Sequence, residues 1–183
     1  MSLLRKLFDL SPIGIQLYTR KFLFGERKTD YQERFVKFDI KENDKVLDIG
    51  SGGDPFPFAT HLVDKFPGDT HHRYQKLKTG NLPFTQADVE SLPFDDKSFD
   101  YVYCSHVLEH VENPAKALDE ISRVGKKGFI EVPARMSDII FNMTRLKHFH
   151  KWYINKVGNK LIFIEAFISQ VHAAFFINIL MFF

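Results

Sequence analysis

The sequence has little of three features that would narrow its function at once: cysteine, an excess of one charge, and long apolar runs. Its single cysteine, Cys104, excludes an internal disulfide and a zinc site built from several cysteines. The formal net charge of +2 is too small to argue for a nucleic-acid partner, and we expect none. With 44% hydrophobic and 26% charged residues, the 183-residue chain has the composition of one globular domain with a sizeable core.

The two ends of the chain are apolar but interrupted. Arg5 and Lys6 break the amino-terminal apolar residues, so we expect no signal peptide. Leu161–Phe183 is rich in phenylalanine, but Glu165 and several neutral polar side chains fall within it, whereas a membrane span needs about 20 mostly apolar residues. We therefore expect a cytoplasmic protein whose carboxyl end packs as a strand and a helix. We do not expect membrane association, and the alternative is that it occurs through this apolar end.

One stretch, Val46–Gly53, indicates where the function lies. Its first four residues are apolar apart from Asp48 and predict a short buried strand. Gly50 and Gly52 follow, and their backbone can bend sharply and let a ligand approach closely. Ligands of open α/β sheets bind at the carboxyl ends of the strands. We therefore expect the site at this turn.

The rest of the chain alternates between short apolar runs and polar turns, which predicts an α/β fold. We expect further strands at five places, residues 59–64, 84–88, 99–105, 129–133 and 160–164. Asn113 and Pro114 predict the start of a helix that ends near Val124. Residues 134–158 are expected to be partly helical. The fold class that follows is a doubly wound, mostly parallel sheet flanked by helices.

Two prolines set the length of the first crossover and bear on the cofactor. Pro55 and Pro57 leave no room for a helix of several turns before the second strand, so we expect a shortened first crossover. A dinucleotide site prefers a third glycine where this chain has Pro55, because that glycine lets the helix and the strand pack closely. The mismatch argues against NAD and FAD.

Three stretches in the same order resemble a known family. Residues 46–53 (VLDIGSGG), 87–100 (ADVESLPFDDKSFD) and 105–111 (SHVLEHV) resemble class I S-adenosylmethionine-dependent methyltransferases, in the small-molecule branch called methyltransferase type 11. The resemblance implies a Rossmann-like methyltransferase fold with an atypical carboxyl end. It also implies one domain over residues 1–183, with a helical cap at 1–38, a cofactor-binding core at 39–133 and an acceptor-side and carboxyl-terminal segment at 134–183.

The resemblance implies S-adenosyl-L-methionine as the cofactor and assigns residues to its parts. Asp48 would anchor the amino group of the methionine part, beside the turn that carries Gly50, Ser51 and Gly52. Asp64 would accept hydrogen bonds from both ribose hydroxyls, which suits a carboxylate because it only accepts. The remaining cofactor-binding positions are Asp88 and Val89 at the adenine, and Ser105.

Candidates for catalysis are His106 and His110, which follow the fourth strand and would share a face on a helical turn. His106 is the first candidate for a general base, and the alternative is that it only shapes the pocket. An aromatic and basic cluster, residues 148–153, would line an acceptor pocket or serve in packing. His71, His72, His148 and His150 have no carboxylate or cysteine at ligand spacing, so we expect no metal site.

We therefore expect methyl transfer to an oxygen or nitrogen of a small molecule, such as a sugar or a lipid-linked metabolite. The alternatives are a non-catalytic binding protein that kept the fold, or a nicotinamide-dependent oxidoreductase. No confident last strand follows Ile164, so one edge of the sixth strand would be open, and a homodimer or a membrane surface would cover it.

Overall fold

The computed structural model describes residues 28–68, 75–133, 150–158 and 160–165. The chain divides into two compact units, Met1–Asp39 and Ile40–Phe183. In the first unit the described residues contain helix α3 (Lys28–Phe35). The expected partition of the chain into cap, core and acceptor-side segment stays a prediction.

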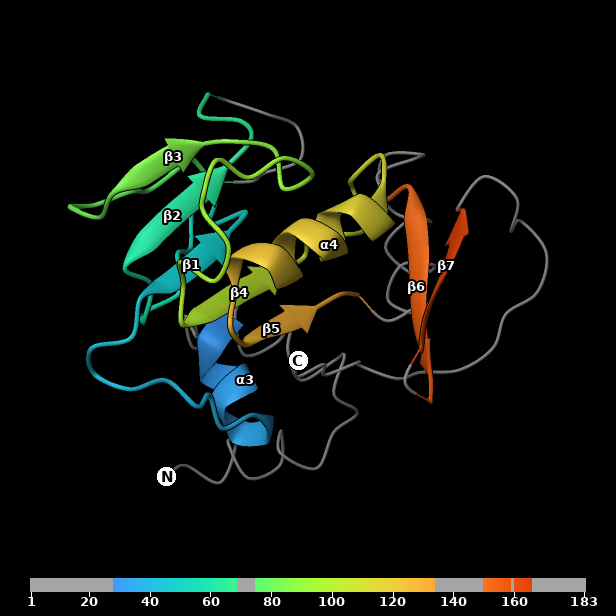
Figure 1. Cartoon of the computed structure of the whole chain (residues 1–183), viewed down its shortest axis with the longest axis horizontal. Helices are drawn as coiled ribbons and strands as arrows, with labels where there is room; N and C mark the ends of the chain where they lie inside the picture. The colour runs from blue at the N-terminus through green and yellow to red at the C-terminus, as the bar shows by residue number, and fades with distance from the viewer. Residues whose placement is uncertain (1–27, 69–74, 134–149, 159, 166–183) are drawn as a thin grey trace, which may run out of the picture. The chain divides into compact units, whose positions relative to one another are not determined.

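The second unit is built on a five-stranded parallel sheet (Figure 1). Its strands are β1 (Val46–Ile49), β2 (His61–Asp64), β3 (Phe84–Gln86), β4 (Tyr101–Ser105) and β5 (Gly128–Glu131). They are ordered β3-β2-β1-β4-β5, and every neighbouring pair is parallel. The chain therefore reverses its direction of winding at β1, which lies between β2 and β4. The expected mostly parallel sheet is confirmed, and a ligand crevice is expected at the carboxyl ends of β1 and β4.

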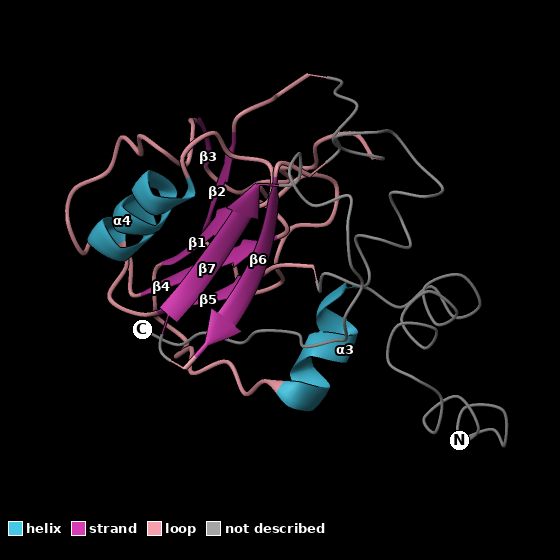
Figure 2. Cartoon of the chain, turned by 90° about the vertical axis from the view of Figure 1, so that its right-hand side faces the viewer, coloured by secondary structure: helices cyan, strands magenta, loops and turns pink. Residues whose placement is uncertain are grey.

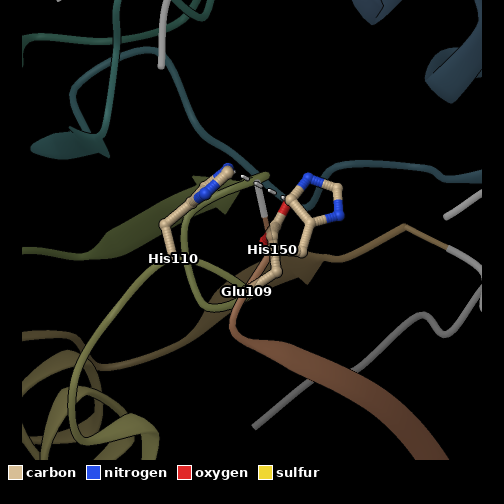
Figure 3. Close-up of side chains that lie close together, drawn as sticks. All are labelled: Glu109, His110 and His150. Carbon is tan, nitrogen blue, oxygen red and sulfur yellow. Dashed lines mark ion pairs between the residues drawn. The ribbon is translucent and has the colours of Figure 1, made fainter. Parts of the chain in front are cut away.

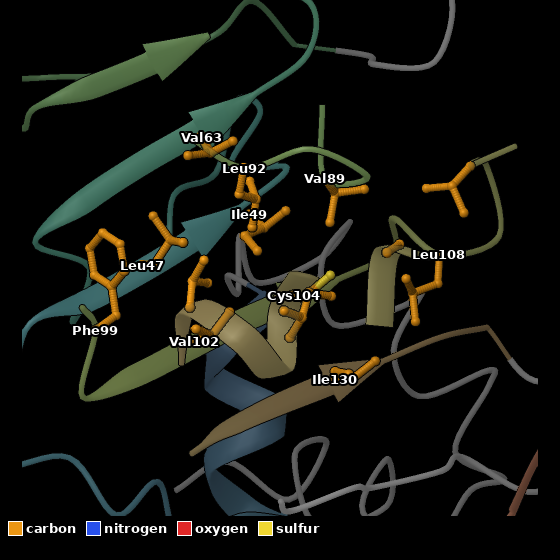
Figure 4. Packing of buried hydrophobic residues seen from close by; sticks show 14 of the residues in the cluster. Leu47, Ile49, Val63, Val89, Leu92, Phe99, Val102, Cys104, Leu108 and Ile130 are labelled. Atoms are coloured by element: carbon orange, nitrogen blue, oxygen red, sulfur yellow. The ribbon is translucent and has the colours of Figure 1, made fainter. Parts of the chain in front are cut away.

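Helix α4 (Pro114–Val124) covers one face of this sheet and forms the main core with it (Figure 4). Asn113 caps the helix, because its side-chain oxygen accepts a hydrogen bond from the Lys116 N–H at 3.0 Å. Alternate residues of a strand face opposite sides, so one set of strand side chains meets the helix. The buried cluster includes, from α4, Ala117, Ile121 and Val124, and from the sheet, Leu47, Ile49, Val102, Cys104 and Ile130.

A packed turn replaces the first crossover helix, as the two prolines predicted. Residues 50–60 contain turns and no helix. The Phe56 ring is buried and stacks on Tyr103, with ring centroids 4.0 Å apart and planes 7° apart. The Phe56 N–H donates to Oδ2 of Asp48 at 2.8 Å, which fixes the turn to β1. The stacked Phe56 ring thus covers part of the sheet face opposite α4, where a crossover helix would otherwise pack.

The carboxyl-terminal third differs from expectation in one respect. Within residues 134–158, expected to be partly helical, residues 152–157 form strand β6 (Trp152–Val157), which pairs antiparallel with β7 (Lys160–Glu165) in a separate two-stranded sheet (Figure 2). The strand expected over residues 160–164 is confirmed as β7, and it pairs with β6 and not with the parallel sheet. The aromatic and β-branched residues of β6 favour a strand, and Gly158 supplies the positive φ of +58° that the connecting turn needs.

Some expectations fall outside the described part of the chain. Three expectations concern residues that the structure does not describe or depend on them. They are the helical character of residues 134–149, the packing of the apolar end after Glu165, and the open strand edge covered by a homodimer. Within the described ranges, neither helix combines the length and the apolar character that a membrane span requires.

Candidate functional site

A pocket opens where the sheet order reverses, at the carboxyl ends of β1, β2 and β4. Its volume is about 290 Å³, near the lower end of the range of about 300–1,000 Å³ for small-molecule sites. Apolar side chains of β1, β2 and the loops after β3 and β4 make up much of its wall, and charged groups stand among them. The lining residues that the sequence singled out are Gly50, Gly52, Asp64, Asp88, Val89, His106 and His110.

The glycine turn forms one wall of the pocket. Gly50 and Gly52 have φ angles of +70° and +55°, which residues with a side chain rarely adopt. The Gly50 N–H donates to the carbonyl of Val63 at 2.7 Å, so the turn is bonded to β2. A Cβ atom at Gly50 would lie 2.3 Å from Cγ2 of Val107, another lining residue. The absence of side chains therefore lets the turn and the loop after β4 meet beside the pocket.

Asp64 ends β2 as a buried carboxylate that faces this turn. Its Oδ2 accepts from the Gly52 N–H at 3.2 Å, and its Oδ1 accepts from the Phe66 N–H at 2.9 Å. These two bonds fix Asp64 in the pocket wall. A carboxylate only accepts hydrogen bonds and has about four lone-pair sites, so it is a side chain suited to hydroxyl groups.

Asp88 and Val89 follow β3 and line the pocket side by side in the sequence. Oδ1 of Asp88 accepts from the Glu90 N–H at 3.0 Å, and Oδ2 pairs with Nζ of Lys65 at 2.6 Å. Partial burial acts to raise the pKa of Asp88, but the bonds from Lys65 and Glu90 outweigh it and the pKa lies below its ordinary value. Val89 is buried and presents an apolar surface beside this ionised carboxylate. The combination suits a flat, partly polar ring.

His106 stands at the end of β4 in a constrained backbone position. Its φ is +59°, and its N–H donates to the Glu131 carbonyl at 2.9 Å. The imidazole lies between two carboxylates, with Nδ1 3.3 Å from Oε1 of Glu109 and Nε2 3.6 Å from Oε2 of Glu131. The side chain is 44% exposed and lines the pocket. His106 is therefore positioned by two acidic groups while it stays accessible to a ligand.

Glu109 is the most enclosed charged group of the site, with no exposed surface. Burial acts to raise the pKa of Glu109. The neighbouring imidazoles of His106, His110 and His150 outweigh burial, so the pKa lies below its ordinary value. The buried carboxylate thus keeps its negative charge because imidazoles surround it.

His110 and Lys151 border the pocket from the loop after β4 and from the start of β6. His106 and His110 do not lie on a helix, since residues 108–110 form a turn closed by a bond from the His110 N–H to the Val107 carbonyl at 2.9 Å. Both nevertheless line the same pocket. Lys151 pairs with Glu112, also a lining residue. The expected aromatic and basic cluster therefore contributes Lys151 to this pocket, and its role toward an acceptor stays a prediction.

Three predicted cofactor residues are buried near the pocket without lining it. Asp48 bonds the Phe56 N–H, and the Ser105 hydroxyl donates to Oε2 of Glu131 at 2.7 Å. The hydroxyl of Ser51 is buried and has no hydrogen-bond partner among the described residues. Asp48 and Ser105 are thus engaged in supporting the turn and the loop, and cofactor contact by any of the three stays a prediction.

The sequence reasoning did not single out several lining residues. They are chiefly Lys65, Phe66, Val107, Val111 and Glu112. Lys65 and Phe66 directly follow Asp64, so their position after a parallel strand was a usable signal. The other three belong to the loop after β4, where only Ser105, His106 and His110 had been given roles.

Comparison with known proteins identifies the domain that carries this pocket. Residues 47–130 match the family model described as "Methyltransferase domain". They form a class I S-adenosylmethionine-dependent methyltransferase domain. The matched segment begins in β1 and ends in β5, so the methyltransferase domain includes the parallel sheet, α4 and most of the pocket wall.

The relatives of this methyltransferase domain are longer proteins. A demethylmenaquinone methyltransferase of Paenarthrobacter aurescens is 35% identical over 112 residues, covering 58% of this chain and 44% of the relative. A ubiquinone/menaquinone biosynthesis C-methyltransferase of Francisella philomiragia is 31% identical over 119 residues, covering 57% and 48%. The chain spans about half the length of these curated relatives. A solved structure, the PH0226 protein of Pyrococcus horikoshii, covers 81% of this chain and 67% of its own at 21% identity, with a TM-score of 0.48.

Proposed function

We propose that this chain binds S-adenosyl-L-methionine in the pocket and transfers its methyl group to a small-molecule acceptor. One observation carries the proposal: the Gly50–Gly52 turn, the buried carboxylate of Asp64 and the Asp88–Val89 pair line a single pocket. These are the three parts that the methyltransferase resemblance implies for the methionine, ribose and adenine portions of the cofactor.

The donors and acceptors of the pocket fit this cofactor. Asp64 lines the pocket as a buried carboxylate, and its two acceptor oxygens match the two adjacent hydroxyls of a ribose. The side-chain-free backbone at Gly50 and Gly52 allows a chain such as a methionine tail to pass closely. Asp88 can accept from an adenine amino group, while Val89 and Val63 provide apolar walls for the ring. These residues would bind and orient the cofactor.

S-Adenosylmethionine supplies an electrophilic methyl group on a sulfonium sulfur. The residues of the chain must align the acceptor with that methyl group and exclude water, because a well-oriented pair reacts far faster than a free one. His106 has an imidazole that is exposed to the pocket and held by Glu109 and Glu131. It would take a proton from an acceptor that must lose one. His110 is the second candidate, as it lines the same pocket.

The acceptor is proposed to be an oxygen or nitrogen of a small molecule. The relatives favour a second candidate, a ring carbon of a reduced quinone, since the printed names of two of them refer to menaquinone or ubiquinone methylation. Both acceptors lose a proton on methylation, so both give His106 the same task. The pocket suits either class, because its wall combines apolar side chains with Lys151 and His110.

The test is an incubation of the purified chain with methyl-labelled S-adenosylmethionine and, separately, a metabolite extract and a soluble quinol. The proposal expects a labelled product from one of them, and the position of the label decides between heteroatom and carbon. Binding of the donor without product from any acceptor would favour the non-catalytic alternative. Fluorescence quenching on binding of nicotinamide nucleotides, together with no affinity for S-adenosylhomocysteine, would favour the oxidoreductase alternative.

A further inference from the structure

Three side chains with metal-binding atoms meet beside the pocket (Figure 3). Glu109, His110 and His150 each offer one ligand atom, and these atoms all lie within 4.8 Å of one another. Glu109 is fully buried, whereas His110 and His150 are partly exposed. Glu109 and His110 belong to the loop after β4, and His150 lies just before β6. The fold therefore brings a carboxylate and two imidazoles together from distant parts of the sequence.

The buried carboxylate of Glu109 would be stabilised by a nearby cation. Both carboxylate oxygens are buried, and neither accepts a well-formed hydrogen bond in the described part of the chain. Two imidazole nitrogens lie near Oε1, Nδ1 of His106 at 3.3 Å and Nε2 of His110 at 4.0 Å. A buried carboxylate is costly unless hydrogen bonds or a coordinated cation compensate for the lost water. The contacts that Glu109 makes leave room for a closer positive partner.

The two imidazole rings lie close enough together to share one metal ion. The His110 and His150 rings have centroids 4.8 Å apart and meet edge to face at 71°. Imidazole nitrogens are among the commonest metal ligands in proteins. One cation between the two rings and Glu109 would be coordinated by all three side chains.

Backbone hydrogen bonds hold the three groups in place. The Lys151 N–H donates to the Glu109 carbonyl at 2.7 Å, which fixes the chain next to His150 against the loop after β4. The indole Nε1 of Trp152 donates to the Val111 carbonyl at 2.9 Å and clamps the same two segments. The three side chains are therefore presented by a preformed scaffold, which lowers the ordering cost of binding.

We propose that Glu109, His110 and His150 bind one divalent transition-metal cation, best matched by Zn²⁺. One carboxylate and two imidazoles form a ligand set that zinc accepts, with a fourth position left for water or a ligand. Mg²⁺ prefers oxygen ligands and is disfavoured by the two imidazoles. Zinc bonds of about 2.0–2.2 Å place neighbouring ligand atoms less than 4.8 Å apart, so small side-chain rotations complete the site.

The proposed site departs from the sequence-based expectation of no metal site, and the metal titration below decides between the two. The sequence reasoning found no carboxylate near the histidines of residues 148–150, and the structure supplies Glu109 from the loop after β4. The cation would bind at the border of the pocket, because His110 lines it. It would also join the start of β6 to the loop after β4, so the folded chain gains stability when metal is present.

The test measures metal binding directly and does not depend on methyl transfer. The chelator-treated, purified chain is titrated with Zn²⁺ by calorimetry, and with Co²⁺ while its visible absorption is followed. We expect one cation per chain, a Co²⁺ spectrum typical of four-coordinate nitrogen and oxygen ligands, and no competition by excess Mg²⁺. No stoichiometric binding of either cation overturns the proposal, whatever the outcome of the methyltransferase assays.

Matched variants assign the site. His110→Ala and His150→Ala should each weaken Zn²⁺ binding at least tenfold and remove the rise in melting temperature that Zn²⁺ causes. His61→Ala, on β2 and bonded to Thr85, should bind Zn²⁺ as the parent does. Glu109→Gln keeps the shape of the buried side chain and should also weaken Zn²⁺ binding. If His150→Ala does not fold, His150→Gln is used in its place. Parent-like binding in both histidine variants overturns the proposal.

Discussion

Gly50 and Val107 are packed so closely that no side chain fits at Gly50. A Cβ atom there would lie 2.3 Å from Cγ2 of Val107, and the Gly50 φ of +70° disfavours a side chain independently. The contact joins the turn after β1 to the loop after β4, the two segments that meet at the reversal of the sheet order. The pocket wall therefore depends on the Val107 side chain packing against the bare backbone of Gly50.

Replacing this glycine should reveal the contact. Gly50→Ala should lower the free energy of unfolding by about 2–5 kcal/mol, which combines about 1–2 kcal/mol for the positive φ with about 1–3 kcal/mol for overpacking. Gly80→Ala is the control, because Gly80 has a φ of +55° but open space around it, so only the backbone cost applies. Urea unfolding of both variants measures the difference. Equal losses in the free energy of unfolding for the two variants would show that the contact with Val107 adds no cost to the Gly50 substitution.

The Asp88–Lys65 pair should make stability depend on pH at the acidic end. Because the pKa of Asp88 is lowered in the fold, the pair stabilises the protein above the ordinary pKa of 3.8, and this contribution is lost as the pH falls through the lower folded value. Lys116 adds positive charge nearby and reinforces the lowering. The pair is partly exposed, so we expect at most about 1 kcal/mol.

The measurement compares the parent with Asp88→Asn by urea unfolding between about pH 7 and pH 3. The difference between them should be constant down to about pH 5 and shrink toward zero below about pH 4. Asp119→Asn, at an exposed position of α4, controls for the loss of a surface carboxylate. A difference that grows as the pH falls would contradict the assignment.

His106 should matter for turnover more than for cofactor binding. If it takes the acceptor proton, His106→Asn lowers kcat by about 10²–10⁴-fold while the Kd for S-adenosylmethionine changes little. The matched control is His61→Asn, since His61 lies outside the pocket and pairs with Thr85. The assay is single-turnover methyl transfer at saturating cofactor. A kcat within twofold of the parent would leave His106 with a role in pocket shape alone.

The α4 face should account for a large share of stability. Ile121 is fully buried between the helix and the sheet, so Ile121→Ala should cost about 2–5 kcal/mol in the free energy of unfolding. The adjacent Ser122 is exposed, and Ser122→Ala should change stability by less than about 0.5 kcal/mol. Thermal and urea unfolding measure both. A loss below about 1 kcal/mol for Ile121→Ala would mean that the helix does not pack as described.

Short sequence patterns were enough to predict two parts of the fold, the start of α4 and the first crossover. Asn113 and Pro114 predicted the start of α4 to the residue, and Pro55 with Pro57 predicted a first crossover without a helix. Asp64 and Asp88 were singled out through the family resemblance, which implied cofactor contacts for them at the end of β2 and after β3. For the helix start and the crossover, neighbouring residues in the sequence carry the information.

The remainder depends on contacts between distant segments, which one sequence does not display. Strand β6 was missed because Asn155 and Lys156 interrupt its apolar pattern, and its partner β7 pairs with it instead of joining the parallel sheet. The approach of His150 to Glu109 rests on backbone bonds between the loop after β4 and the start of β6. Nothing near either residue in the sequence indicates that pairing.

The central claim is that this pocket binds S-adenosylmethionine through Asp64. Calorimetric titration of the purified chain with S-adenosylmethionine tests it most directly, with Asp64→Ala as the variant and Asp119→Ala as the charge-matched surface control. We predict one site per chain in the parent and the control. In Asp64→Ala we expect affinity about 10–100-fold lower, because a hydrogen bond to a charged group contributes about 1.5–3 kcal/mol. No binding by the folded parent, or equal affinity in parent and Asp64→Ala, would contradict the account.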